Sequence, residues 1–118
     1  MSVVELEVFA GRPNPRFTLA PAGSRHLLEL LGRLSEPATP FRPRLGYQGL
    51  AVYARGADGR WRPWLHVGGG RVTVRYGPRA GVYRDTIDLE GWLLDEADRA
   101  GLGPVLDQVL PGRRRQAR

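Results

Sequence analysis

Hydrophobic and polar residues alternate in several short stretches of this chain, as they do in β-strands that bury one face. The first stretch covers residues 3–10. Its apolar positions are Val4, Leu6, Val8 and Ala10, and its acidic positions are Glu5 and Glu7. Residues 16–19 form a second, shorter extended segment. The pattern therefore predicts a strand at the N-terminus, followed by a short strand or an extended edge.

The pattern changes to that of an amphipathic helix over about residues 22–34. Its apolar stripe consists of Leu27, Leu28, Leu31 and Leu34. Pro21 suits the first helical turn, whereas Pro37 and Pro40 prevent the helix from continuing. Residues 35–48 contain three prolines and no periodic pattern, which indicates a loop that crosses the fold.

Three alternating segments follow, at residues 50–55, 61–67 and 71–76. Asp58-Gly59 is a strong signal for a hairpin turn between the first two. The run Gly68-Gly69-Gly70 permits a second tight reversal. Pro63 cannot donate to a strand ladder, so its strand is an edge at that point or carries a bulge. These segments predict a three-stranded antiparallel meander over residues 50–76.

A further strand is predicted at residues 82–87, and a second main helix begins near Leu89, capped by Thr86 or Asp88. Gly101 ends this helix, and Pro104 begins a shorter one. The predicted fold class is α+β: an antiparallel sheet, made of the meander at 50–76 and the N-terminal strand, with two main helices packed on one face.

The chain has 118 residues, which suits one hydrophobic core. We expect a single domain at 1–112 and a basic tail at 113–118. Four of the arginines lie in that tail, and the remaining residues carry 14 arginines against 12 acidic residues. All basic residues are arginine, which indicates a GC-rich coding bias. The arginine count is therefore weak evidence of function, although the clustering of arginines is informative.

Composition excludes several kinds of chemistry. The chain has no cysteine, so disulfides and thiolate sites are excluded. Two histidines, His26 and His66, make a metal site improbable, and residues 68–70 match no phosphate-binding loop, so we predict no metal and no cofactor. No apolar run is long enough to span a membrane, and no leader is recognisable. We expect a soluble, cytoplasmic protein without a membrane partner.

The loop Gly11-Arg12-Pro13-Asn14-Pro15-Arg16 is the first candidate site. Its prolines restrict the backbone and hold it extended around Asn14, the only asparagine in the chain. Arg12 and Arg16 flank the amide, so the loop could bind a carboxylate, a phosphate or another backbone. The alternative is a structural turn in which Asn14 bonds its own neighbours.

One face of the meander is the second candidate site. Strict alternation places these residues on the core face: Leu50, Val52, Ala54, Trp61, Leu65, Val67, Val72, Val74 and Tyr76. The opposite face then carries Tyr53, Arg55, Arg62, Trp64, His66, Arg71, Thr73 and Arg75. Arginines interleaved with aromatic rings suit an anionic planar partner. The alternative is an ordinary solvated face.

Three functional hypotheses follow. The leading one is a small non-catalytic binding or accessory module that holds an anionic small molecule or a peptide or protein partner. Its predicted ligand-binding residues are Arg12, Asn14, Arg16, Trp64, His66, Arg71 and Arg75. The second is a small enzyme or biosynthetic accessory protein with His66 as acid or base, paired with Asp85 or Asp88. The third is a nucleic-acid binder that uses the meander and the basic tail.

Overall fold

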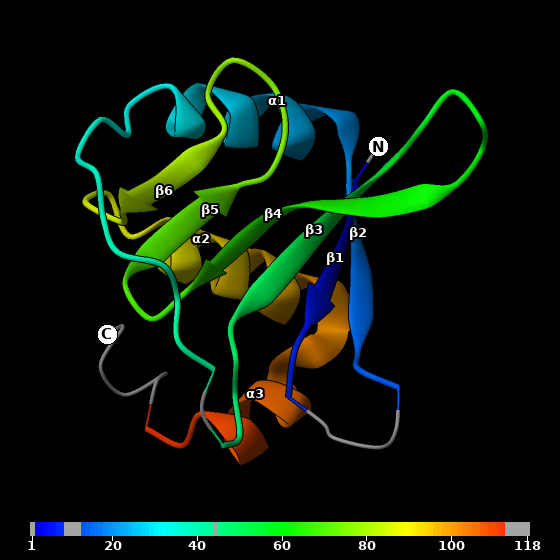
Figure 1. Cartoon of the computed structure of the whole chain (residues 1–118). Helices are drawn as coiled ribbons and strands as arrows, with labels where there is room; N and C mark the ends of the chain where they lie inside the picture. The colour runs from blue at the N-terminus through cyan, green and yellow to red at the C-terminus, as the bar shows by residue number, and fades with distance from the viewer. Residues whose placement is uncertain (1, 9–12, 44, 113–118) are drawn as a thin grey trace.

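The computed structural model describes residues 2–8, 13–43 and 45–112, and its strands in these ranges form one antiparallel sheet in the order β2-β1-β3-β4-β5-β6 (Figure 1). The strands are β1 (Ser2–Leu6), β2 (Arg16–Leu19), β3 (Leu50–Arg55), β4 (Trp61–Gly68), β5 (Arg71–Val74) and β6 (Gly81–Arg84). The predicted α+β class with an antiparallel sheet is confirmed. The order is no simple meander, because β1 lies between β2 and β3.

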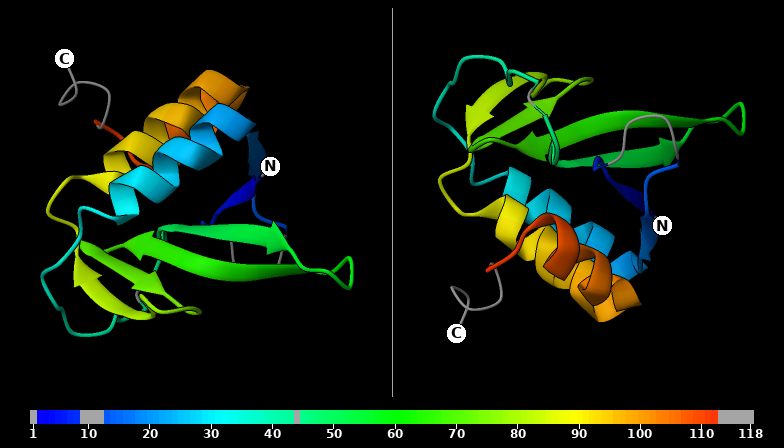
Figure 2. Two further views of the ribbon diagram at one scale, coloured as in Figure 1. Left: turned by 90° about the horizontal axis from the view of Figure 1, so that it is seen from above. Right: turned by 90° about the horizontal axis from the view of Figure 1, so that it is seen from below.

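The helices cover one face of this sheet (Figure 2). They are α1 (Pro21–Leu31), α2 (Leu89–Ala97), a short segment η1 (Asp98–Leu102) that kinks at Gly101, where φ is 95°, and α3 (Gly103–Val109). As predicted, Asp88 caps α2 by accepting from the backbone N–H of Gly91. None of the helices in the described ranges is long and apolar enough to cross a membrane.

The hydrophobic core lies between the sheet and the helices. Its buried strand residues include Val4, Leu6, Leu50, Val52, Leu65, Val67, Val72 and Val74. On α1, Leu27 and Leu30 are buried, whereas Leu28, which we placed in the apolar stripe, is exposed. The alternation of the sequence therefore located the inward face of β1, β2, β3 and β5, while the stripe of α1 is rotated from the predicted one.

A β-bulge in β4 overturns part of the predicted meander face. Val52 pairs with Leu65, but Tyr53 pairs with Pro63, so Trp64 is the extra residue. Trp64 packs against the core instead of facing outward. Trp61, predicted to lie on the core face, is 43% exposed. Tyr76, predicted on the same face, is exposed for another reason, since it lies beyond the end of β5. The bulge predicted as one alternative at Pro63 is therefore present, but the predicted faces were wrong beyond it, because one extra residue reverses the alternation for the rest of β4.

The segment between α1 and β3 runs round the β6 edge onto the sheet face that the helices leave open, here called the outer face (Figures 1 and 2). Residues 36–38 bond to β6 through Ala38 N–H to Val82 O and Arg84 N–H to Glu36 O. Beyond that edge, Phe41 contacts the ring of His66. The predicted crossing loop thus becomes a second layer over one end of the outer face.

Candidate functional site

A row of residues in register crosses the outer face of the sheet. Glu5 pairs with Ala51, Ala51 with His66, His66 with Thr73, and Thr73 with Val82. Cross-strand neighbours on one face lie about 4.5–5.5 Å apart at Cβ. Ala51 and Thr73 are the cross-strand neighbours of His66, and the small side chain of Ala51 leaves open space beside the imidazole.

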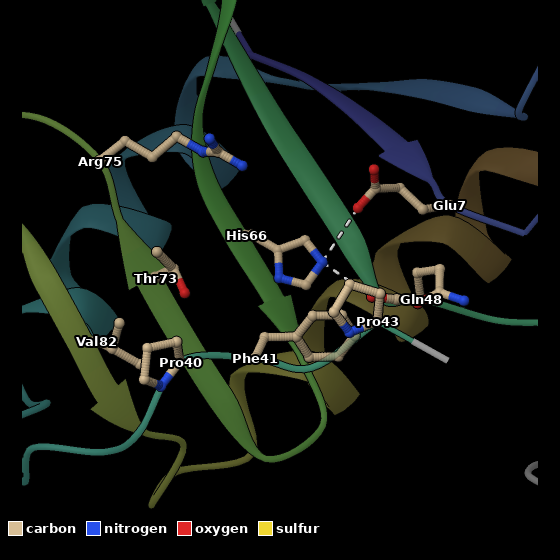
Figure 3. Close-up of a pocket in the computed structure, with 9 residues that line it drawn as sticks. All are labelled: Glu7, Pro40, Phe41, Pro43, Gln48, His66, Thr73, Arg75 and Val82. Atoms are coloured by element: carbon tan, nitrogen blue, oxygen red, sulfur yellow. Dashed lines mark hydrogen bonds and ion pairs between the residues drawn. The ribbon is translucent and has the colours of Figure 1, made fainter. Parts of the chain in front are cut away.

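The crossing loop closes this row into a pocket with a cavity volume of about 430 Å³, here called the outer pocket (Figure 3). Its polar lining residues are Glu7, Gln48, His66, Thr73 and Arg75, and its apolar lining residues are Pro40, Phe41, Pro43 and Val82. The volume lies within the range of about 300–1,000 Å³ typical of small-molecule sites. The outer pocket is therefore the candidate functional site.

His66 is the most constrained polar side chain in the outer pocket. It is only 8% exposed, and its Nε2 lies 2.9 Å from the carbonyl oxygen of Gln48 and 3.1 Å from Oε1 of Glu7. A carbonyl oxygen only accepts, so Nε2 carries a hydrogen. In the neutral ring, Nδ1 then holds the lone pair. In Figure 3 this second nitrogen lies on the side of the ring turned towards Thr73.

Two glycines allow the close approach that holds His66. A Cβ at Gly68 would lie 2.9 Å from the carbonyl oxygen of Gln48 and 3.3 Å from Cε1 of His66. A Cβ at Gly49 would clash with the carbonyl oxygen of Val67, and Gly49 has a φ of 103°. Both positions require glycine, because any side chain would push β3 and β4 apart where Gln48 meets His66.

Arg75 brings a positive charge to the outer pocket. Within the described part of the chain, its guanidinium makes no hydrogen bond and no ion pair. Figure 3 shows Arg75 and Glu7 on opposite sides of His66, with Thr73 on the side of Arg75. The outer pocket therefore combines a carboxylate, an oriented imidazole, a hydroxyl and a guanidinium.

Asn14 and Arg16 belong to a separate cluster at the β2 edge of the sheet, here called the loop corner (Glu5, Asn14 and Arg16). Oδ1 of Asn14 accepts from the N–H of Val8 at 3.0 Å, and its Nδ2 donates to Glu5 at 3.4 Å. Arg16 donates to Oε2 of Glu5 through Nε at 2.7 Å and Nη2 at 2.6 Å. Arg12, also predicted for this site, lies outside the described residues.

The loop corner affects the pKa of Tyr53. The ring of Tyr53 lies 5.2 Å from the guanidinium carbon of Arg16. Burial raises the pKa of Tyr53, and the negative charge of Glu5 raises it further. The positive charges of Arg16 and Arg75 act in the opposite direction with smaller effect. Tyr53 thus links the loop corner electrostatically to the outer pocket.

The remaining predicted site residues lie elsewhere. Arg71 donates to the backbone oxygens of Thr39 and Gly69 and to the Thr39 hydroxyl, so it fastens the crossing loop to β5. Trp64 packs on the helix side of the sheet. Of the seven predicted ligand-binding residues, the structure brings His66 and Arg75 together in the outer pocket.

Glu7, Phe41 and Gln48 are pocket residues that the sequence did not predict. Glu7 had only its outward position in the N-terminal strand as a signal, whereas Phe41 and Gln48 lie in a segment without periodicity. The predicted acidic partners of His66 have other roles. Asp85 accepts from the N–H groups of Leu89 and Glu90, and Asp88 caps the same helix. The pairing of His66 with Asp85 or Asp88 was therefore wrong, and Glu7 is its partner.

Within the described residues, no three histidine, aspartate or glutamate side chains lie close enough to hold a metal ion. Comparisons with protein families, with curated proteins and with solved structures found no match to this chain.

Proposed function

We propose that the outer pocket binds a small molecule with a carboxylate or phosphate group, and that this binding is the function of the protein. The observation that carries the proposal is Arg75, a guanidinium in a cavity of small-molecule size with no anionic partner among the described residues. Guanidinium pairs with carboxylate and phosphate through two parallel hydrogen bonds.

The other lining groups favour a ligand that is anionic at one end and apolar beyond it. The Thr73 hydroxyl and Nδ1 of His66 lie on the Arg75 side of the outer pocket (Figure 3). The hydroxyl donates or accepts, and Nδ1 accepts in the neutral ring and donates once protonated. Phe41 and two prolines supply apolar surface on the crossing loop. A peptide would use the same groups through its C-terminal carboxylate.

The loop corner contributes less to this function than we predicted. Glu5 already accepts from Asn14 and from Arg16. A ligand anion would compete with this carboxylate for the guanidinium of Arg16. Arg75, and not the loop at 11–16, is therefore the proposed anion-binding residue.

The experiment is a melting-temperature screen with benzoate, succinate, inorganic phosphate, phenyl phosphate and short peptides. A ligand at about 100 times its Kd stabilises the folded protein by roughly 2.7 kcal/mol. We expect at least one class to raise the melting temperature of the wild type but not of Arg75→Ala. Arg25→Ala is the matched control, because Arg25 is an exposed arginine on α1. A shift of equal size in wild type and Arg75→Ala would refute the proposal.

A second candidate function is catalysis with His66 as a general base. The observation that favours it is the pair of contacts at Nε2, since a carboxylate and a carbonyl that orient one ring nitrogen leave the other to take a proton. Glu7 would be the positioning residue, and Arg75 would hold the substrate anion. The described residues include no cysteine, so the nucleophile would be water, a ligand group or the hydroxyl of Thr73, which pairs with His66 across the strands.

His66→Gln separates the two functions. General base catalysis contributes about 10²–10⁴-fold to a rate. With mono-p-nitrophenyl succinate, an ester that carries a free carboxylate for Arg75, an enzyme should lose about that factor in His66→Gln and retain most of its ligand-induced melting shift. Equal hydrolysis by wild type and variant, together with an intact ligand shift, would leave binding as the function.

A further inference from the structure

A second surface with binding chemistry lies on the hairpin that joins β3 and β4. Its turn, residues 56–60, extends past the helical layer into solvent (Figures 1 and 2). Tyr53, Arg55, Arg60 and Trp61 are here called the hairpin surface. It lies outside the residues that line the outer pocket.

Register across the hairpin places Tyr53, Arg55 and Trp61 on one face, and Arg60 lies in the turn directly before Trp61. Tyr53 lies on the outer face, so Arg55, two residues further along β3, lies there too. Trp61 pairs directly with Arg55. Trp61 and Tyr53 are diagonal neighbours across the β3–β4 pair. Such neighbours lie about 7–8 Å apart on one face of the sheet. The bulge at Trp64 creates this arrangement, because it moves Trp61 from the helix side to the outer side.

The charges of the hairpin surface are available to a partner. Arg55 donates to the backbone oxygen of Gly59 and has no acidic partner among the described residues, and the side chain of Arg60 has no hydrogen bond or ion pair there. Asp58, the acidic residue of the turn, pairs with Arg62 at 2.6 Å. The end of the hairpin therefore presents Arg55 and Arg60, neither of which forms an ion pair with a described acidic residue, beside the exposed Trp61.

We infer that the hairpin surface binds single-stranded nucleic acid. Arginine pairs with phosphate, and an exposed ring stacks on the face of an unpaired base, which a duplex conceals. The exposed ring of Trp61, flanked by Arg55 and Arg60, supplies both contacts at once. A purely acidic protein partner would use the arginines and leave Trp61 without a role.

The experiment measures binding of the full chain to a fluorescent oligothymidylate of about 15 nucleotides at about 50 and 200 mM salt. Loss of one stacked base weakens binding roughly 5- to 150-fold, and we expect this of Trp61→Ala. For single strands, each neutralised phosphate contributes about −0.7 to the slope of log K against log salt. Arg55→Ala and Arg60→Ala should each reduce the steepness of the slope by about that amount.

Two matched variants are the controls. Tyr76→Ala removes an exposed aromatic residue outside the hairpin, and Arg25→Ala removes an exposed arginine on α1. Both should bind as the wild type does. The basic residues at 113–118 are present in every variant, so their contribution cancels.

Four outcomes would overturn the inference. They are no binding to the oligonucleotide, an effect of Trp61→Ala below about twofold, equal competition by a duplex of the same length, and self-association that depends on Trp61. The last would assign the hairpin surface to a second copy of the chain. Because Arg75 and His66 are unchanged in these variants, the result is independent of ligand binding in the outer pocket.

Discussion

The loop corner and the outer pocket lie on the same face of one sheet and contain the same kinds of groups, yet they differ in how those groups are used. In the loop corner, Glu5 accepts from Asn14 and Arg16, and Asn14 also accepts from the backbone of Val8. In the outer pocket, Arg75 has neither a hydrogen bond nor an ion pair among the described residues. Donors bonded to internal acceptors stabilise the fold, whereas donors left to solvent are available to a ligand.

The largest effect is expected from Gly68→Ala, which tests how the outer pocket is built. The new Cβ would contact the carbonyl oxygen of Gln48 and the ring of His66. Overpacking of this kind costs about 1–3 kcal/mol, and we expect about 2–3 kcal/mol in urea denaturation. Ligand-induced melting shifts should also fall. A stable variant with normal ligand response would show that the Gln48 contact does not shape the pocket.

Glu5→Ala should cost less, about 1–2 kcal/mol, because it leaves the donors of Asn14 and Arg16 without their acceptor. The loss is moderate since the side chain of Arg16 is 58% exposed and water replaces part of the contact. Urea denaturation gives the value. If ligand response in the outer pocket collapsed as well, the two clusters would be coupled.

Asn14→Ala tests whether the amide serves the fold alone. It removes the acceptor of the Val8 N–H and one donor to Glu5, so we expect a loss of about 1 kcal/mol. The melting shift with the pocket ligand should be unchanged. A variant that keeps its stability and loses the ligand shift would return the binding site to the loop at 11–16.

Arg75→Ala should change stability by less than about 0.5 kcal/mol, because the side chain is exposed and bonded to no described group. The same variant should lose the ligand response. Asn14→Ala should show the opposite result, a loss of stability with an unchanged ligand response. A stability loss above about 1 kcal/mol would show that Arg75 has an internal role and that the contrast between the clusters is false.

The smallest effect concerns Tyr53 at alkaline pH. Its folded-state pKa is raised above 10.0, so the folded state holds the proton more tightly than the unfolded state. The contribution of Tyr53 to stability is fully present below the pKa of the unfolded state. It is lost as pH rises through the pKa of the folded state. Urea denaturation at about pH 9 and pH 11 should show a smaller loss for Tyr53→Phe than for the wild type. Equal losses would mean that Glu5 and burial do not act on Tyr53 as described.

Local patterns in the sequence predicted most of the secondary structure. Alternation located the inward residues of β1 and β5, and Asp58-Gly59 marked the β3–β4 hairpin. Pro37 lies beyond the end of α1, and Asp88 caps α2. These features depend on neighbours a few residues apart, so a linear pattern contains them. Together they determined the α+β class.

Only the tertiary structure decided which side chains meet. His66 is held by Glu7 and by the carbonyl of Gln48, residues that the order of the strands and the crossing loop bring together. A single extra residue at Trp64 moved Trp61 to the outer face. Pro63 indicated an edge or a bulge there, but alternation could not decide between them, because the register depends on the partner strand. Contacts between distant segments follow from packing of the whole chain, which is why the outer pocket and the hairpin surface became visible only in the fold.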